Sequence, residues 1–275
     1  MSGPSLTIGD YTVTAFSDGI FQTTIDTTVG VDKQMTQKIS GKSLTDPVWL
    51  AVNAFLIEGK GIRALVDAGT GDTMGPSLGK LPENLANAGI ASDSISHILL
   101  THIHPDHSNG LIDSDGTPWF PKAEVVVQDE EYRFWVERDL GEAHHERQRG
   151  NMQRARAAFA PYSKQTTRIS DGEFLPGIIA QKSPGHTPGH TAWTIEGDGD
   201  SLMIWGDTIH MAFLQLQNPE IAFQFDVDPA QAIASRKRLL DQTAADRSRI
   251  AGMHLDFPGF GYVKRQGSGY VIEGV

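Results

Sequence analysis

Apolar and polar residues alternate along the first part of the chain in the manner of β-strands. Residues 11–16 alternate, and residues 48–57 form a longer apolar run. Gly59-Lys60-Gly61 then predicts a hairpin turn into a further strand over residues 62–67. A β-hairpin is therefore expected in the first quarter of the chain.

The pattern changes to helical spacing after this hairpin. Leu78, Leu81, Leu85 and Ala88 recur three or four residues apart, and Gly89 follows them as a candidate C-terminal cap. Residues 96–100 return to a short apolar run, which predicts another strand. A strand, a helix and a strand are thus expected in succession.

The remaining chain alternates strand-like and helix-like segments. Predicted strands cover residues 124–127, 174–182, 191–196, 201–205 and 250–254, and predicted helices start at Asp129 and cover residues 142–159 and 229–241. No repeat, low-complexity segment or linker interrupts this order. It favours two sheets with helices outside them.

Residues 20–45 are polar and rich in threonine, and they predict an irregular arm or loop. The chain of 275 residues contains 39% hydrophobic residues, enough for a sizeable core. We therefore expect residues 1–275 to form a single domain whose first 45 residues include an N-terminal arm.

Composition excludes several kinds of function. The chain has no cysteine, which rules out disulfides, thiolate metal sites and cysteine nucleophiles. Its formal net charge of −11 argues against nucleic acid as a partner. No apolar run reaches the length of a membrane span, and the N-terminus does not resemble a signal peptide. A cytoplasmic protein is expected, or a secreted one if a leader was removed.

The densest group of metal-binding residue types follows the strand over residues 96–100. His102, His104, Asp106 and His107 lie within six residues. Imidazole and carboxylate groups are usual ligands of zinc and similar divalent ions. A strand that ends in this turn would direct the four side chains into one pocket.

Three more candidate ligands occur downstream, each beside a glycine at the end of an apolar run. They are His186 in Gly185-His186-Thr187, Asp207 in Trp205-Gly206-Asp207, and His254 in Gly252-Met253-His254. Strand ends at one edge of a sandwich can converge in space, so these residues are candidates for the same site.

This motif series resembles that of the metallo-β-lactamase fold. The resemblance covers essentially the whole chain and implies an α+β, four-layer αββα sandwich with two metals at the sheet edge. It implies that His102, His104 and His186 hold one metal, that Asp106, His107 and His254 hold the other, and that Asp207 bridges them. Two divalent ions are expected, with zinc first and Mn, Fe or Co as alternatives.

Other residues acquire roles through the same resemblance. Asp67 resembles the family's first-motif aspartate and is expected to hydrogen-bond a ligand histidine, and His190 is a candidate for a similar supporting role. The expected substrate-pocket residues are Phe120, Trp135, His210, Phe213 and Tyr262. The His144-His145 pair is expected on a solvated helix face.

The C-terminal third is most similar to the methyl parathion hydrolase branch, through residues 205–210, 225–229 and 254–259. Tyr262 and Asp256 depart from that branch's pattern, which puts the substrate in doubt more than the chemistry. The resemblance implies a bridging hydroxide that attacks phosphotriesters, lactones or aryl esters, with Asp106 and Asp207 as the catalytic carboxylates. A small-molecule substrate, no membrane partner and a possible homodimer are expected.

Three alternatives differ from this hypothesis. The first is an N-acyl homoserine lactonase, which uses the same chemistry on a quorum signal. The second is a non-hydrolytic iron redox protein of the same fold. The third is a serine hydrolase, because Gly75-Pro76-Ser77-Leu78-Gly79 matches a nucleophile elbow, but no strand leads directly into Ser77.

Overall fold

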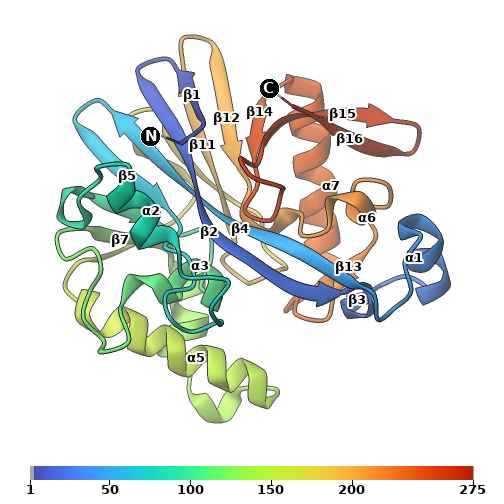
Figure 1. Ribbon diagram of the computed structural model, residues 1–275, viewed down its shortest axis with the longest axis horizontal. Coiled ribbons are helices and arrows are strands. Elements are labelled where there is room, and N and C mark those ends of the chain that lie inside the picture. The colour runs from blue at the N-terminus through green and yellow to red at the C-terminus, as the bar shows by residue number, and fades with distance from the viewer. Residues whose placement is uncertain (1–2, 275) are drawn as a thin grey trace.

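Two seven-stranded mixed sheets form the centre of the molecule (Figure 1). The computed structural model describes residues 3–274. The first sheet has the strand order β1 (Ser5–Ile8), β2 (Tyr11–Thr24), β4 (Pro47–Gly59), β5 (Ile62–Val66), β6 (His97–Leu99), β7 (Glu124–Gln128) and β8 (Thr166–Ile169). Its strands β5 to β8 are parallel neighbours, whereas β1, β2, β4 and β5 pair antiparallel.

The second sheet is built by the C-terminal half. Its strand order is β16 (Gly269–Glu273), β15 (Phe260–Gln266), β14 (Arg249–Ala251), β12 (Asp200–Ile204), β11 (Thr191–Gly197), β10 (Ile178–Lys182) and β9 (Gly172–Leu175). Only β12 and β14 are parallel neighbours among these described strands. A separate two-stranded ribbon joins β3 (Thr28–Val29) to β13 (Ala222–Phe223).

Helices cover the outer face of each sheet (Figure 1). The α-helices are α1 (Lys33–Ser40), α2 (Leu81–Asn87), α3 (Pro105–Ser108), α4 (Asp129–Tyr132), α5 (Glu146–Phe159), α6 (Ala212–Gln215) and α7 (Pro229–Asp246). One buried cluster packs α2 and α5 onto the first sheet, and another packs α7 onto the second. The predicted αββα sandwich is thus confirmed.

The interface between the sheets is apolar. Val13, Phe55 and Val66 of the first sheet pack with Trp193 and Ile204 of the second, and all five side chains are fully buried. A fully buried side chain of this size stabilises the fold by roughly 1.5–3 kcal/mol. This packing fixes the two sheets against each other, and with them the loops at their shared edge.

Short one-turn elements occupy several connections. The structure has 3-10 turns η1 (Ile25–Thr27), η2 (Ser92–Ser94), η3 (Asn109–Leu111), η5 (Leu140–Glu142), η6 (Ala160–Tyr162) and η7 (Gly206–Thr208), and a π-helical turn η4 (Arg133–Glu137). None of the helices in residues 3–274 combines the length and apolar character needed to cross a membrane.

The prediction of an irregular arm over residues 20–45 was wrong in part. Strand β2 continues to Thr24, and residues 33–40 form helix α1, capped by Asp32 and by Gly41 in the left-handed region (φ 66°). The arm lies at the periphery beside α6 (Figure 1). Its sequence is mostly polar because only one side packs on the fold, so hydrophobic periodicity did not reveal the helix.

Two other boundaries differ from the predictions. The single strand predicted over residues 174–182 is a hairpin, because Pro176 and Gly177 (φ 78°) turn the chain between β9 and β10. The helix predicted from residue 142 begins at Glu146, after η5. The strand β8 and the C-terminal hairpin of β15 and β16 were not predicted.

Candidate metal centre

Loops at the ends of strands from both sheets bring the candidate ligands together. His102, His104, Asp106 and His107 follow β6 of the first sheet. Pro105 occupies the first position of α3, so the chain turns directly into a helix that carries Asp106 and His107. The other three ligands come from the second sheet: His186 lies between β10 and β11, Asp207 follows β12, and His254 follows β14.

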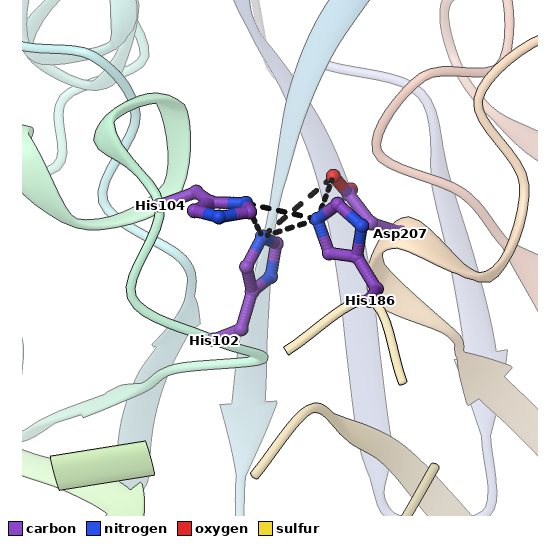
Figure 2. Close-up of side chains that lie close together, drawn as sticks. All are labelled: His102, His104, His186 and Asp207. Atoms are coloured by element: carbon purple, nitrogen blue, oxygen red, sulfur yellow. Dashed lines mark hydrogen bonds and ion pairs between the residues drawn. The ribbon is translucent and has the colours of Figure 1, made fainter. Parts of the chain in front are cut away.

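The first set of donor atoms surrounds one point (Figure 2). It contains His102 Nε2, His104 Nδ1, His186 Nε2 and Asp207 Oδ2. The histidine nitrogens lie 2.9–3.2 Å from one another, and Asp207 Oδ2 lies 3.2 Å from His186 and 3.6 Å from His102. Zinc bonds of about 2.0–2.1 Å in a tetrahedron put ligand atoms about 3.3 Å apart.

The second set shares Asp207 with the first. Its atoms are Asp106 Oδ2, His107 Nε2, His254 Nε2 and Asp207 Oδ1. Each histidine nitrogen lies 3.5 Å from Asp106 Oδ2 and 3.2 Å from Asp207 Oδ1. Asp207 therefore presents one carboxylate oxygen to each set, as a bridging ligand would.

Two orphaned atoms show that the second set suits a cation. His107 Nε2 and Asp207 Oδ1 are buried and have no hydrogen-bond partner among the described residues. Burying unpaired polar atoms is costly, so native proteins satisfy them with a partner, a water or an ion. A divalent ion between them satisfies both atoms, and the all-nitrogen-and-oxygen donor set matches zinc and its neighbours.

The Nδ1 atoms of three ligand histidines are also fixed by hydrogen bonds. His107 Nδ1 donates to Asp67 at 2.7 Å, His186 Nδ1 donates to Asp226 at 2.7 Å, and His254 Nδ1 donates to the Ala51 carbonyl at 2.7 Å. These bonds set the tautomer in which Nε2 is free to bind a metal. Asp67 thus makes a hydrogen bond to a candidate ligand histidine, as predicted, and Asp226 holds His186 in the same way.

Charge and burial shift the pKa values of the cluster in opposite directions. Burial lowers the pKa of His102 and His104 well below the ordinary value, and nearby histidines lower it further. Burial alone would raise the pKa of Asp106, but His107 and His254 outweigh it and lower that pKa. In His107, His186 and His254 the neighbouring carboxylates outweigh burial and raise the pKa. Because a metal binds neutral imidazole, metal binding there would displace protons.

His190 positions Asp207. Its Nε2 accepts the Asp207 backbone N–H at 2.9 Å, and its Nδ1 lies 2.8 Å from Ser183 Oγ. Burial, with His186 nearby, lowers the His190 pKa to about 3, so the ring is neutral and can accept. Gly206 leaves it room, because a Cβ there would lie 2.5 Å from His190 Nε2.

A cavity of about 320 Å³ opens over the ligands. His210 lines it, with its Nε2 2.9 Å from Asp207 Oδ2. Trp135 lines an adjoining cavity of about 230 Å³, and its ring centroid lies 5.2 Å from that of His104. These two expected pocket residues therefore lie beside the metal centre.

The other three expected pocket residues are not among the described residues that line these two cavities. Phe120 lies in the core under α5, with 1% of its surface exposed. Phe213 is exposed on α6. Tyr262 lies on β15, where its hydroxyl accepts from Arg249 Nε at 3.0 Å. The sequence alone could not show that the fold directs these three side chains away from the site.

Sequence reasoning missed part of the cavity wall. The apolar residues Phe21, Met74 and Phe225 line the main cavity, as do Arg147, Asn151 and Arg154 of α5. In the sequence, only the spacing of the three α5 residues, which puts them on one helix face, could have indicated that they act together. His144 and His145 are exposed, as expected, but they precede α5 and do not lie on it, and both line the adjoining cavity.

Buried Glu131 was also missed. Its Oε1 accepts the Ile103 N–H and its Oε2 accepts the Gly189 N–H, both at 2.8 Å. One carboxylate thus ties the loop of His102 and His104 to the loop of His186. No local pattern distinguishes Glu131 from the neighbouring acidic residues of α4, so only the fold reveals it.

Comparisons with known proteins agree with this geometry. The sequence model of the metallo-beta-lactamase superfamily matches residues 47–254. The N-acyl homoserine lactonase AiiA of Bacillus thuringiensis subsp. kurstaki is 26% identical over 230 residues, which cover 76% of this chain and 82% of AiiA.

Two solved structures are similar over the whole chain. The hydrolase AbOPH, of the beta lactamase superfamily, has a TM-score of 0.92 and 30% identity, with 100% of this chain and 97% of AbOPH covered. AidC, a dizinc quorum-quenching lactonase solved with a product N-hexanoyl-L-homoserine, has a TM-score of 0.89 and 26% identity, with 100% and 98% covered.

Proposed function

The chain belongs to the metallo-beta-lactamase superfamily and is a metal-dependent hydrolase, and we propose that it opens lactones and cleaves aryl esters with two zinc ions. The observation that carries this proposal is the placement of Asp207 between two donor sets on the floor of an open cavity. The seven candidate ligands are arranged for two neighbouring cations. A single-iron redox protein needs no complete second set of donor atoms, so this arrangement favours hydrolysis.

Two divalent ions bound there would polarise an acyl oxygen and lower the pKa of a water from 15.7 to about 7. In the hydrolysis, the acyl C–O bond breaks, the hydroxyl of water joins the acyl carbon, and a proton passes to the leaving oxygen. Asp106, whose side chain is 14% exposed, is the carboxylate placed to hold the water's proton. Asp207 keeps the two donor sets at a fixed spacing.

The cavity wall supports an acyl or aromatic group in the substrate. Phe21, Met74 and Phe225 supply apolar surface, and the Phe21 ring meets His254 edge-on at 5.7 Å. Such walls exclude water and hold an apolar substituent over the reacting atoms. The similar lactonases AiiA and AidC support a lactone as the first substrate to test, N-acyl homoserine lactones among them.

Phosphotriesters are the second candidate. Their support is the resemblance of residues 205–210 to the methyl parathion hydrolase branch. A phosphotriester makes similar demands on the site, namely a polarised oxygen, an in-line attack and a good leaving group. The two classes must therefore be compared directly.

The test is a parallel assay of purified protein whose metal content has been measured. The panel contains N-acyl homoserine lactones, dihydrocoumarin, nitrophenyl acetate, paraoxon, methyl parathion and nitrocefin. We expect two metals per chain and the highest kcat/KM for a lactone or aryl ester, with turnover abolished in a folded Asp106→Asn variant. Protein with two metals bound that hydrolyses none of the esters or lactones would overturn the proposal.

A further inference from the structure

Helix α5 places three polar side chains in the wall of the metal cavity. Arg147, Asn151 and Arg154 all line it, and their spacing of four and three residues puts them on one helix face. The metal ligands form the floor of the same cavity. A substrate that reaches the metals therefore lies next to this cationic face, which consists of Arg147, Asn151 and Arg154.

Both arginines are free to bind an anion. None of the described residues forms an ion pair with either guanidinium, whereas Arg63, Arg133, Arg138, Arg168, Arg249 and Arg265 all have acidic partners. Arg149 and Arg247 also lack an acidic partner among the described residues, but Arg147 and Arg154 differ from them because they line the metal cavity. Guanidinium groups bind carboxylate and phosphate through paired N–H donors.

Arg147 is held in place by an aromatic ring that also contacts the metal centre. Its guanidinium lies 5.3 Å from the Phe225 ring centroid, and Phe225 meets the His186 ring edge-on at 5.9 Å. Arg147 also lines the adjoining cavity, so it stands at the junction of the two spaces. A substrate group bound by Arg147 would therefore lie beside the metal ligands, separate from the bond that is cleaved.

The acidic groups around Arg147 are already engaged. Asp106 and Asp207 belong to the metal sets, and both oxygens of Asp226 accept hydrogen bonds, from His186 and from the Phe223 N–H. Asp72 and Asp113 line a third cavity that Arg154 shares. Arg147 therefore carries most of the free positive charge, and Arg154 adds to it.

We propose that the cationic face of α5 binds an anionic group of the substrate, so that the preferred substrate is an ester or lactone carrying a carboxylate or phosphate-type group away from the bond that is cleaved. This inference rests on the proposed hydrolytic function. The apolar residues Phe21 and Met74 contact the rest of the molecule, and the anion sets its orientation.

The experiment compares nitrophenyl esters that share one leaving group and differ in the group at the other end of the acyl chain. Mono(4-nitrophenyl) glutarate carries a free carboxylate, its methyl ester is neutral, and 4-nitrophenyl 4-phosphonobutanoate carries a phosphonate. With metal-loaded protein we expect kcat/KM for an anionic ester to exceed that for the methyl ester by about tenfold, the scale of one charge-assisted hydrogen bond. The larger of the carboxylate and phosphonate ratios identifies the group that the face prefers.

Variants then locate the preference. The anionic-to-neutral ratio should fall to about one in Arg147→Gln with Arg154→Gln, and added salt should reduce it in the unmodified protein because the arginines are exposed. Arg149→Gln is the matched control. Arg149 is exposed on the same helix and is not among the described residues that line the three cavities.

The outcomes separate the two proposals. If the methyl ester is hydrolysed at least as well as both anionic esters, or if Arg149→Gln lowers the ratio as much as the paired variant does, the anion-binding role is wrong while hydrolysis stands. If none of the three esters is hydrolysed while a lactone is opened, the anion-binding role is likewise wrong, whereas protein with two metals bound that hydrolyses neither these esters nor any lactone overturns the hydrolytic proposal itself. Metal content is measured for every variant, so that a fall in the anionic-to-neutral kcat/KM ratio can be distinguished from a loss of metal.

Discussion

At the scale of single residues, hydrogen bonds behind the ligands matter as much as the ligands. Asp226 is buried, and its Oδ1 accepts the Nδ1–H of His186 at 2.7 Å. That bond leaves Nε2 of His186 free to face the first donor set. Supporting groups of this kind orient a ligand ring and raise its basicity.

The substitution Asp226→Asn tests this role. The amide keeps the size of the side chain and loses its charge, so we expect the affinity of the first set for zinc to fall by about 10–100-fold. Competition with a chromophoric chelator measures the loss. Asp198→Asn, in an exposed turn, is the control that should leave the affinity unchanged. Equal affinities for the Asp226 variant and the unmodified protein would contradict the role.

Metal uptake is also expected to depend on pH through His186. Burial lowers the pKa of this imidazole, but hydrogen bonds to Asp207 and Asp226 outweigh burial and raise it to about 9. Metal-free protein therefore carries a proton on His186 at neutral pH, and that proton must leave when a metal binds. Carboxylates also raise the pKa of His107 and His254, so the apparent affinity should rise with pH from neutrality through about 9.

Calorimetric titration in buffers of different ionisation enthalpy measures the protons released. Because the fold raises the pKa of His186, the proton on this imidazole stabilises the metal-free fold at low pH. This stabilisation is lost as the pH rises through about 9. Asp226→Asn removes one of the causes that raise the His186 pKa, so fewer protons should be released at neutral pH when this variant binds metal. Metal binding without proton release at neutral pH would rule this account out.

At the scale of elements, α4 connects the two loops that carry the first donor set. Glu131 accepts the N–H groups of Ile103 and Gly189, which lie in different loops. Neither loop has regular structure at these points, so the buried carboxylate replaces the hydrogen bonds that a sheet would supply.

We therefore expect Glu131→Gln to destabilise the protein. A glutamine amide directs its N–H₂ group at one of the two backbone donors, which leaves that buried donor unsatisfied at a cost of about 1–3 kcal/mol in the free energy of unfolding. Chemical denaturation of metal-loaded protein measures the change. Glu130→Gln removes only the neighbouring exposed ion pair with Lys182, worth roughly 0–1 kcal/mol. A stability loss no larger than that of the control would contradict the bracing role.

At the scale of the whole molecule, the metal centre joins the two sheets. Four candidate ligands follow β6 in the first sheet, and the other three come from loops of the second. Direct bonds support the same junction: Trp193 Nε1 donates to the Leu100 carbonyl at 3.1 Å and the Thr191 N–H donates to Thr101 at 2.8 Å. Bound metals would therefore link the two halves of the sandwich.

Removal of the metals should lower stability as well as abolish activity. A ligand that binds only the folded state at 100 times its Kd contributes about 2.7 kcal/mol. We expect dialysis against a chelator to lower Tm and to eliminate lactone hydrolysis, and readdition of zinc to restore both. Thermal unfolding with and without metal measures the difference. An unchanged Tm together with complete loss of metal would show that the sheets do not depend on the link.

The sequence by itself determined the strands next to the site and the identity of the ligand candidates. Each of the seven lies at the end of an apolar run or in the turn that follows, so a local pattern both forms the strand and places the side chain at its end. Absence of cysteine fixed the donor chemistry as nitrogen and oxygen. Asp67 was predicted through its resemblance to the first-motif aspartate of the family, and the structure places it directly after β5.

Only the tertiary structure decided which residues form the cavity wall and brace the ligands. Phe21, Arg147 and Phe225 come from distant segments and meet over the metals, while Phe120 and Tyr262 pack elsewhere. The physical reason is that a wall position depends on how a helix or strand is rotated against its neighbours. That rotation is set by long-range packing of the whole core, which no local spacing of residues records.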